Sequence, residues 1–100
     1  MTQSHTARPK VLLPPFEFQL DGKTPYIIKV QLADGDQMLC NVNASLAPVT
    51  LLIAFNGLVL SSRTYSGRGQ GGITAASSGV YALEFESTSP AEVWVSLTSA

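Results

Sequence analysis

Charged side chains are scarce in this sequence: they make up 13% of its 100 residues, about half the usual share in globular proteins. Six Lys and Arg stand against seven Asp and Glu, so the formal net charge is −1. Such a chain has no basic field with which to attract nucleic acid or an anionic membrane, and we expect neither as a partner. So little charge suits a surface that is partly covered by protein subunits, as in a homo-oligomer or a lattice.

Cysteine and histidine are almost absent. Cys40 is the only cysteine, which excludes an intrachain disulfide, and its apolar neighbours predict a small buried side chain. His5 is the only histidine and lies in a polar stretch, so triads that need a positioned imidazole are close to excluded. One His and one Cys cannot complete the four ligands of a closed zinc site. We therefore expect no enzyme: no catalytic residues, no cofactor and no metal.

Long apolar runs are also missing. The longest, 51–55, is far too short to span a membrane, and the polar N-terminus lacks the apolar segment of a secretory signal. We expect a protein made in the cytoplasm without a signal peptide, and a place in a virion is left open.

What the sequence has instead is alternation of period two. Polar and apolar residues alternate in most of the apolar stretches, whereas no segment keeps the i, i+3, i+4 spacing of a helix for ten residues. We predict an all-β fold, an antiparallel β-sandwich or jelly roll of seven or eight short strands. Leu52 interrupts the polar side of one strand, which we therefore expect to be covered on both faces. The expected strands include 16–20, 26–32, 38–42, 49–55, 58–60, 81–85 and 93–97.

Turn signals separate these stretches. Asn56-Gly57 lies between two apolar runs and is the strongest hairpin signal in the chain, because both residues tolerate a positive φ. Asp34 and Asp36 flank Gly35 and offer oxygen ligands for calcium. The alternative, which we favour, is a β-turn whose Asp side chains bond to the local backbone.

Four of the eight glycines fall within residues 66–72, SGRGQGG. This stretch has no Lys where a P-loop needs one, and no helix follows it as in a dinucleotide-binding fold, so a phosphate site is disfavoured. We expect a mobile loop over 63–72, which is either slack between strands or ordered by a partner. Its side chains able to contact a partner are Arg63, Tyr65 and Arg68.

The first residues differ from the rest. We divide the chain into an extended N-terminal arm, 1–15, and a single β-sandwich domain, 16–100. The arm ends in two prolines, which favour extended backbone. It is either a frayed tail or a device that reaches a neighbouring subunit, with Arg8, Lys10, Val11, Leu12 and Leu13 as its contact residues.

Three stretches resemble motifs of pre-peptidase C-terminal-like jelly rolls. Residues 32–39, LADGDQML, look like their A-G-D-x-hydrophobic turn, and residues 51–57, LLIAFNG, look like their apolar strand with a polar-Gly turn. Residues 78–85, SGVYALEF, look like their S-G-x-Y strand. The resemblance implies a jelly-roll fold and a role like that of carbohydrate-binding modules. Small jelly rolls that stand alone are also similar in architecture to decoration or cement proteins of bacteriophage capsids.

From these features we expect a non-enzymatic structural subunit of a larger assembly, most concretely a capsid decoration or cement protein that acts by protein–protein contacts. The alternative is a carbohydrate-binding jelly-roll module, in which an exposed aromatic such as Trp94, Tyr65 or Tyr26 stacks on sugar.

Two features of the last strands bear on this choice. Trp94 is out of phase with its apolar neighbours, so it faces the other side of its strand, as a sugar platform or an intersubunit anchor. Glu84 and Glu86 share an outer face and fit a solvated or partner-facing surface better than a catalytic pair. The expected partner contacts are Arg8, Lys10, Val11, Leu12, Leu13, Arg63, Tyr65, Arg68 and Trp94.

Overall fold

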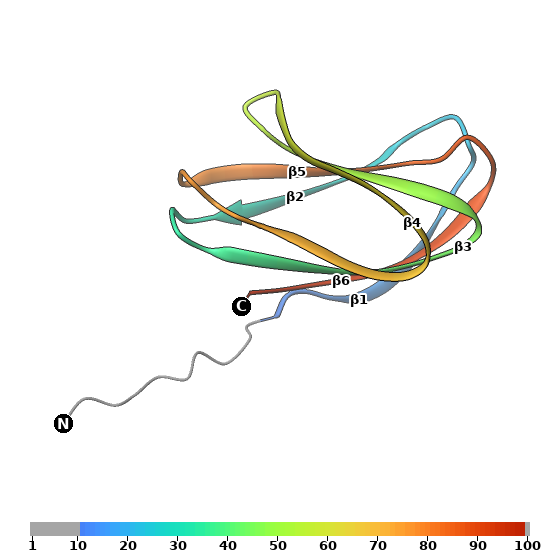
Figure 1. Cartoon of the computed structure of the whole chain (residues 1–100), viewed down its shortest axis with the longest axis horizontal. Helices are drawn as coiled ribbons and strands as arrows, with labels where there is room; N and C mark the ends of the chain where they lie inside the picture. Colours follow the sequence, from blue (N-terminus) through green and yellow to red (C-terminus); the bar gives the residue numbers. More distant parts are fainter. Residues whose placement is uncertain (1–10, 100) are drawn as a thin grey trace.

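The computed structural model describes residues 11–99, which form one antiparallel sheet of six strands (Figure 1). The prediction of an all-β fold is confirmed, and these residues contain no helix that could span a membrane. The strands are β1 (Val11–Leu20), β2 (Tyr26–Leu32), β3 (Gln37–Phe55), β4 (Leu58–Thr74), β5 (Gly79–Glu86) and β6 (Ala91–Ser99).

The sheet curls because its longest strand, β3, changes partner along its length. Residues 38–45 of β3 pair with β6, and residues 50–55 pair with β5. On its other edge β3 pairs with β4 throughout, with a register shift between Ala44 and Val49. The strand order is therefore β1-β6-β3-β5-β2, with β4 beside β3.

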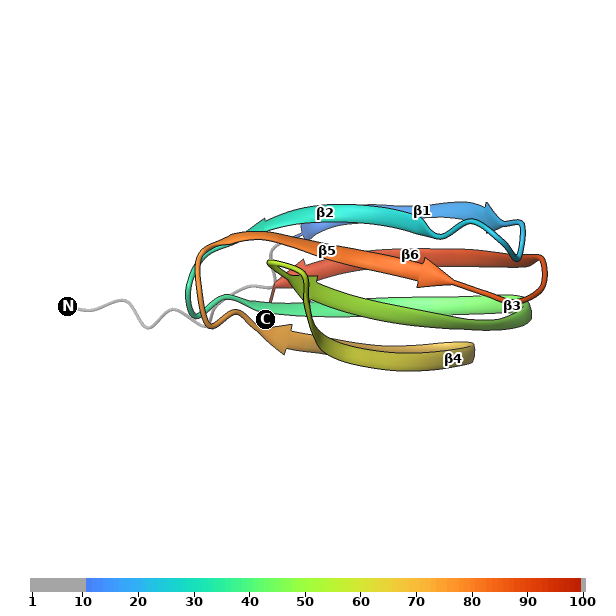
Figure 2. The same ribbon diagram turned by 90° about the horizontal axis from the view of Figure 1, so that it is seen from above.

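Two halves of the sheet result. We call them the β6 half (β1, β6 and the adjoining stretches of β3 and β4) and the β5 half (β2, β5 and their adjoining stretches). Figure 1 shows the two halves on opposite sides of the space that holds the core. Seen from above in Figure 2, β1 and β2 lie at one side of the molecule and β4 lies at the other.

The number of strands differs from the seven or eight that the alternation predicts. The expected break around residues 43–48 is a bend inside β3, where Leu46 adopts a positive φ of 75°. A second register shift lies between Ile53 and Ala54 of β3. The pairing with β4 continues on both sides of this shift, so β4 is one strand of 17 residues. The expected strands 38–42 and 49–55 are therefore parts of one strand, β3, and the expected strand 58–60 is the beginning of the longer β4.

The core lies between the two halves and is built from the inward faces of the strands. Cys40 is fully buried among these side chains, as predicted, and burial raises the pKa of its thiol to about 12. The largest fully buried side chains are Tyr81, Phe85, Leu32, Met38, Leu83 and Leu97.

Aromatic rings close the side of the molecule between β1 and β2. The ring of Phe18 stacks on that of Tyr26 with 4.0 Å between centroids, and it meets the ring of Phe85 edge-on at 5.2 Å. This cluster joins the free edges of the two halves, so apolar surface there is removed from water.

The stretch SGRGQGG is not a loop, and the prediction of a mobile loop over 63–72 is wrong. Gly67, Gly69 and Gly71 alternate along β4 on its inward face, opposite buried residues of β3. The ring of Tyr65 occupies the space that a Cβ at Gly69 or Gly71 would need. The glycines therefore make room for a buried ring.

The last residues of the expected arm, 11–15, belong to the sheet. β1 starts at Val11, which pairs with Thr98, and the register shifts on either side of Leu13. Pro14 and Pro15 have no backbone N–H to donate to a neighbouring strand. An edge strand such as β1 tolerates this, whereas a central strand would lose hydrogen bonds. Leu12 and Leu13 are partly buried and pack against the core; their contact with a neighbouring subunit stays a prediction. Arg8 and Lys10 lie outside the described residues.

The two predicted turns are confirmed. Asn56 and Gly57 join β3 to β4 with φ angles of 52° and 78°. At the turn after β2, Asp36 Oδ2 accepts a hydrogen bond from the backbone N–H of Ala33 at 2.8 Å, as expected for a structural turn.

Candidate functional site

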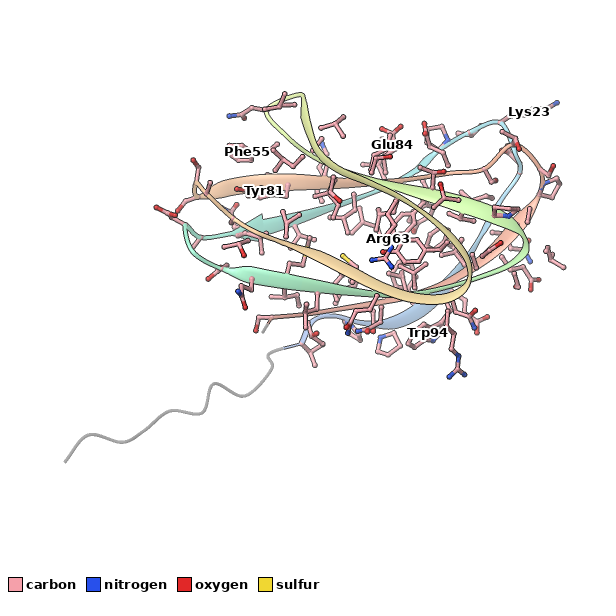
Figure 3. All side chains as sticks on the ribbon, viewed as in Figure 1. Lys23, Phe55, Arg63, Tyr81, Glu84 and Trp94 are labelled. Carbon is pink, nitrogen blue, oxygen red and sulfur yellow. The ribbon has the colours of Figure 1, made fainter. Side chains whose placement is uncertain are left out.

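The outer face of the β6 half carries the strongest candidate for a binding site. Trp94 alternates with buried residues of β6, so its indole lies on the side away from the core (Figure 3). Asn43 of β3 is its cross-strand partner, and Arg68 of β4 is paired with Asn43 on the other side. A guanidinium, an amide and an indole thus stand in one row across three strands.

A second row lies beside the first and is linked by hydrogen bonds. Gln70 Nε2 donates to Asn41 Oδ1 at 2.9 Å, and Asn41 Nδ2 donates to Ser96 Oγ at 3.4 Å. These bonds fix the orientation of the Asn41 amide, and each partner keeps further donors or acceptors for a ligand.

The two rows line a shallow depression of about 770 Å³. We call this surface the binding face. Its residues are Asn41, Asn43, Arg68, Gln70, Trp94 and Ser96.

The edge of the binding face is acidic. Glu17 of β1 is the cross-strand partner of Trp94, on the side opposite Asn43, and Glu92 precedes Trp94 on the same face of β6. Because neighbouring strands are about 4.8 Å apart, the row from Arg68 to Glu17 spans roughly 14 Å. The face therefore offers one cation at one end, carboxylates at the other, and an aromatic ring with amides between.

This chemistry is suited to binding a polar ligand. Within residues 11–99 no group of three His, Cys, Asp or Glu is placed to hold a metal ion. The face combines an apolar ring with directional donors and acceptors, a combination typical of sites that orient polar ligands.

The structure separates the residues that the sequence analysis expected to contact a partner. Trp94 and Arg68 come together on the binding face. Tyr65 does not: it is only 4% exposed, and burial raises the pKa of its phenol. The guanidinium of Arg63 lies over the ring of Tyr65 at 5.4 Å from the centroid, and Nη1 donates to the carbonyl of Gln70 at 2.7 Å. Val11 is 61% exposed at the start of β1.

The amides and the hydroxyl of the binding face were missed. A signal for them was present, because Asn41 and Asn43 alternate with buried residues of β3 just as Trp94 and Ser96 alternate along β6. That alternation assigns each residue to a face but does not say which residues of different strands stand side by side.

Glu84 and Glu86 lie on the outer face of the β5 half, as predicted. A side-chain hydrogen bond from Glu86, together with some burial and the nearby negative charge, raises the pKa of Glu84. Neither carboxylate belongs to the binding face, because the two faces lie on opposite sides of the core (Figure 3).

No family model matches the sequence, and no curated protein matches it. Solved structures do match the fold. The pre-peptidase C-terminal domain of a collagenase from Bacillus anthracis superimposes with a TM-score of 0.70 at 12% identity, over 86% of this chain and 89% of that one. The resemblance to pre-peptidase C-terminal domains is thereby confirmed for the fold.

Two further similar structures are periplasmic inhibitors of g-type lysozyme, named PliG. The Aeromonas hydrophila protein gives a TM-score of 0.63 at 13% identity, over 97% of this chain and 92% of that one. The Salmonella Typhimurium protein gives 0.55 at 15% identity, over 97% and 94%. At these identities the likeness shows the fold alone.

Proposed function

We propose that this chain is a non-enzymatic carbohydrate-binding protein and that the binding face is its glycan site. The observation that carries the proposal is the row formed by Trp94, Asn43 and Arg68 beside a second row of amides. In finer terms, we propose that the curled sheet is a jelly roll, in line with the pre-peptidase C-terminal domain that it resembles.

A sugar suits this face for physical reasons. The C–H side of a pyranose ring is apolar and packs on an indole, while its hydroxyl groups both donate and accept hydrogen bonds. The amides of Asn41, Asn43 and Gln70 also do both, so they match hydroxyls of either orientation. Arg68 favours a carboxylate or another acceptor at one end of the ligand.

The absence of catalysis is part of the proposal. Its support is that the face holds no histidine and that Glu17 and Glu92 are exposed. The similar solved structures are, by their printed names, a pre-peptidase C-terminal domain and lysozyme inhibitors.

A second candidate is the structural subunit expected from the sequence. Its support is a group of exposed apolar side chains at the β3–β4 hairpin, where Leu58 is 65%, Val59 is 52% and Leu60 is 45% exposed. A place in a capsid stays a prediction.

The single tryptophan makes the glycan proposal direct to test. Trp94 is the only tryptophan in the chain, so its emission reports on the binding face alone. We expect a glycan found by array screening to shift this emission and to protect it from acrylamide quenching. Calorimetry then measures Kd for the wild type and for Trp94→Ala.

Trp94→Ala should weaken binding by roughly 2 kcal/mol, about thirtyfold in Kd, because it removes the stacking platform. Gln31→Ala, at an exposed position of the β5 half, is the matched control and should leave Kd unchanged. A glycan that binds Trp94→Ala as tightly as the wild type, or no glycan bound at all, contradicts the proposal.

A further inference from the structure

The outer face of the β5 half mixes exposed apolar side chains with charged and polar ones. Three of its side chains are about half exposed: Ile27 at 51%, Val59 at 52% and Val80 at 51%. Single exposed apolar residues are ordinary, but apolar residues that four neighbouring strands contribute to one face favour an interaction surface. We call it the β5 face; its apolar residues are Ile27, Leu52, Ala54, Val59, Val80 and Ala82.

Strand register gives this face its shape. Small alanines stand in the middle of one row, and longer side chains stand at its ends and in the next row. The centre therefore lacks long side chains, and a second surface can approach the sheet there. The rows are Lys29–Ala82–Ala54–Val59 and Ile27–Glu84–Leu52–Ser62.

We propose that the β5 face is the surface on which two copies of this chain pair. The face carries charges of both signs: Lys29 of β2 and Glu84 of β5 lie in adjacent rows of neighbouring strands, and Glu86 follows Glu84 on the same side of β5. Within residues 11–99 Lys29 forms no ion pair. A twofold axis brings residue i against residue j twice, so Lys29 of each copy meets Glu84 of the second copy.

The charge pattern favours a second copy over an unrelated partner. A face of one sign calls for a partner of the opposite sign, whereas this face carries both signs around an apolar centre. Leu52 fits the same account: it is a half-buried apolar residue on the outer side of β3, where a polar one would suit open solvent.

The pair should be weak. Four strands about 4.8 Å apart and about six residues long give a flat face of roughly 15 by 20 Å, smaller than the ~800 Å² that each partner buries in a standard interface. We therefore expect a monomer–dimer equilibrium that depends on concentration.

Pairing through this face goes beyond glycan binding and leaves the binding face open. Trp94 and Glu84 point away from the core on opposite sides of the molecule (Figure 3). A dimer through the β5 face therefore carries two binding faces that are directed apart, which would let it bridge two glycan chains.

Sedimentation velocity of the full chain from about 10 µM to about 1 mM tests the proposal. We expect the dimer fraction to rise with concentration in the wild type and to vanish in Ala82→Arg, which places a long cation among the small side chains at the centre of the face. Gln19→Arg adds the same charge on the β6 half and should dimerise like the wild type. Circular dichroism establishes that both variants are folded.

A charge swap tests the pairing geometry. Lys29→Glu and Glu84→Lys should each abolish the dimer, and the double variant should restore it. A wild type that stays monomeric at every concentration, or a dimer that survives Ala82→Arg, overturns the proposal. Trp94→Ala should dimerise normally, so failure of the dimer and failure of glycan binding are distinguishable.

Discussion

The ring of Tyr65 fills the space that a side chain at Gly69 would need, although the two residues are four apart in one strand. In a flat strand their side chains would stand well apart, and they meet because β4 bends between them, where Gly67 has a φ of 89°. The bent strand thereby covers the core with its own ring.

Gly69→Ala should destabilise the protein by about 1–3 kcal/mol, because the new methyl group collides with the Tyr65 ring in a closed space. The free energy of unfolding in urea measures the effect. Arg68→Ala, the next residue on the outer side of the same strand, is the control and should cost less than about 0.5 kcal/mol.

A double variant tests whether Tyr65 is the residue with which the new methyl group at position 69 collides. In a Tyr65→Ala background the cost of Gly69→Ala should largely disappear, because the space has been vacated. If the losses in unfolding free energy caused by Tyr65→Ala and Gly69→Ala simply add in the double variant, Tyr65 is not the residue that excludes a side chain at position 69.

Phe18→Ala should cost about 2–3 kcal/mol, because it removes the ring that joins Tyr26 and Phe85 between β1 and β2. Gln19→Ala, the exposed neighbour in β1, should be close to neutral. Thermal unfolding followed by circular dichroism measures both. Equal melting temperatures for the two variants would rule out a closing role for the aromatic cluster.

Asp21 gives the chain a predictable response to acid. Its Oδ1 accepts hydrogen bonds from the backbone N–H groups of Thr24 and Lys23, both at 2.7 Å, and these bonds hold the pKa of the carboxyl below its ordinary value of 3.8. A lowered folded pKa stabilises the fold above the unfolded pKa, and this contribution is lost as the pH falls through the folded value. The melting temperature of Asp21→Ala should lie below that of the wild type at pH 7, and the difference should close in acid. A difference independent of pH would argue against a role for the charge.

Cys40 should be inert in the folded protein. Its thiol is fully buried and burial raises its pKa from 9.0 to about 12, so neither access nor ionisation permits reaction at pH 8. A chromogenic disulfide reagent should react only after denaturant is added. Rapid reaction without denaturant would contradict this placement.

The raised pKa of the Cys40 thiol also predicts that the folded protein loses stability at alkaline pH. Below pH 9 the thiol is neutral in both states; between pH 9 and about 12 only the unfolded state ionises, which favours unfolding. In that window the wild type should lose stability more steeply than Cys40→Ala. Parallel curves would show that the thiol titrates equally in both states.

Much of the fold was readable from local patterns. Alternation with period two gave the β class, the inward set that includes Cys40 and the outward position of Trp94, because neighbouring side chains of a strand point to opposite faces. The Asn56-Gly57 hairpin followed from the positive φ that both residues tolerate.

The two stretches that were wrongly placed outside the sheet share one physical cause. Glycine-rich residues 63–72 and the start of β1 were placed outside the sheet because local composition speaks against a strand in both. Their strands are stabilised by partners far along the chain: β3 lies beside the glycines, and β6 lies beside the prolines. No local pattern reports such partners.

Where apolar and polar residues alternate, the sequence by itself determined which residues face inward and which face outward, since neighbouring side chains of an extended backbone point to opposite faces. The tertiary structure decided where β3 bends, and through that bend which outward residues became neighbours. Trp94, Asn43 and Arg68 form one row only because register across three strands aligns them. Register is set by packing of the whole inward face, so it does not exist until the sheet has formed.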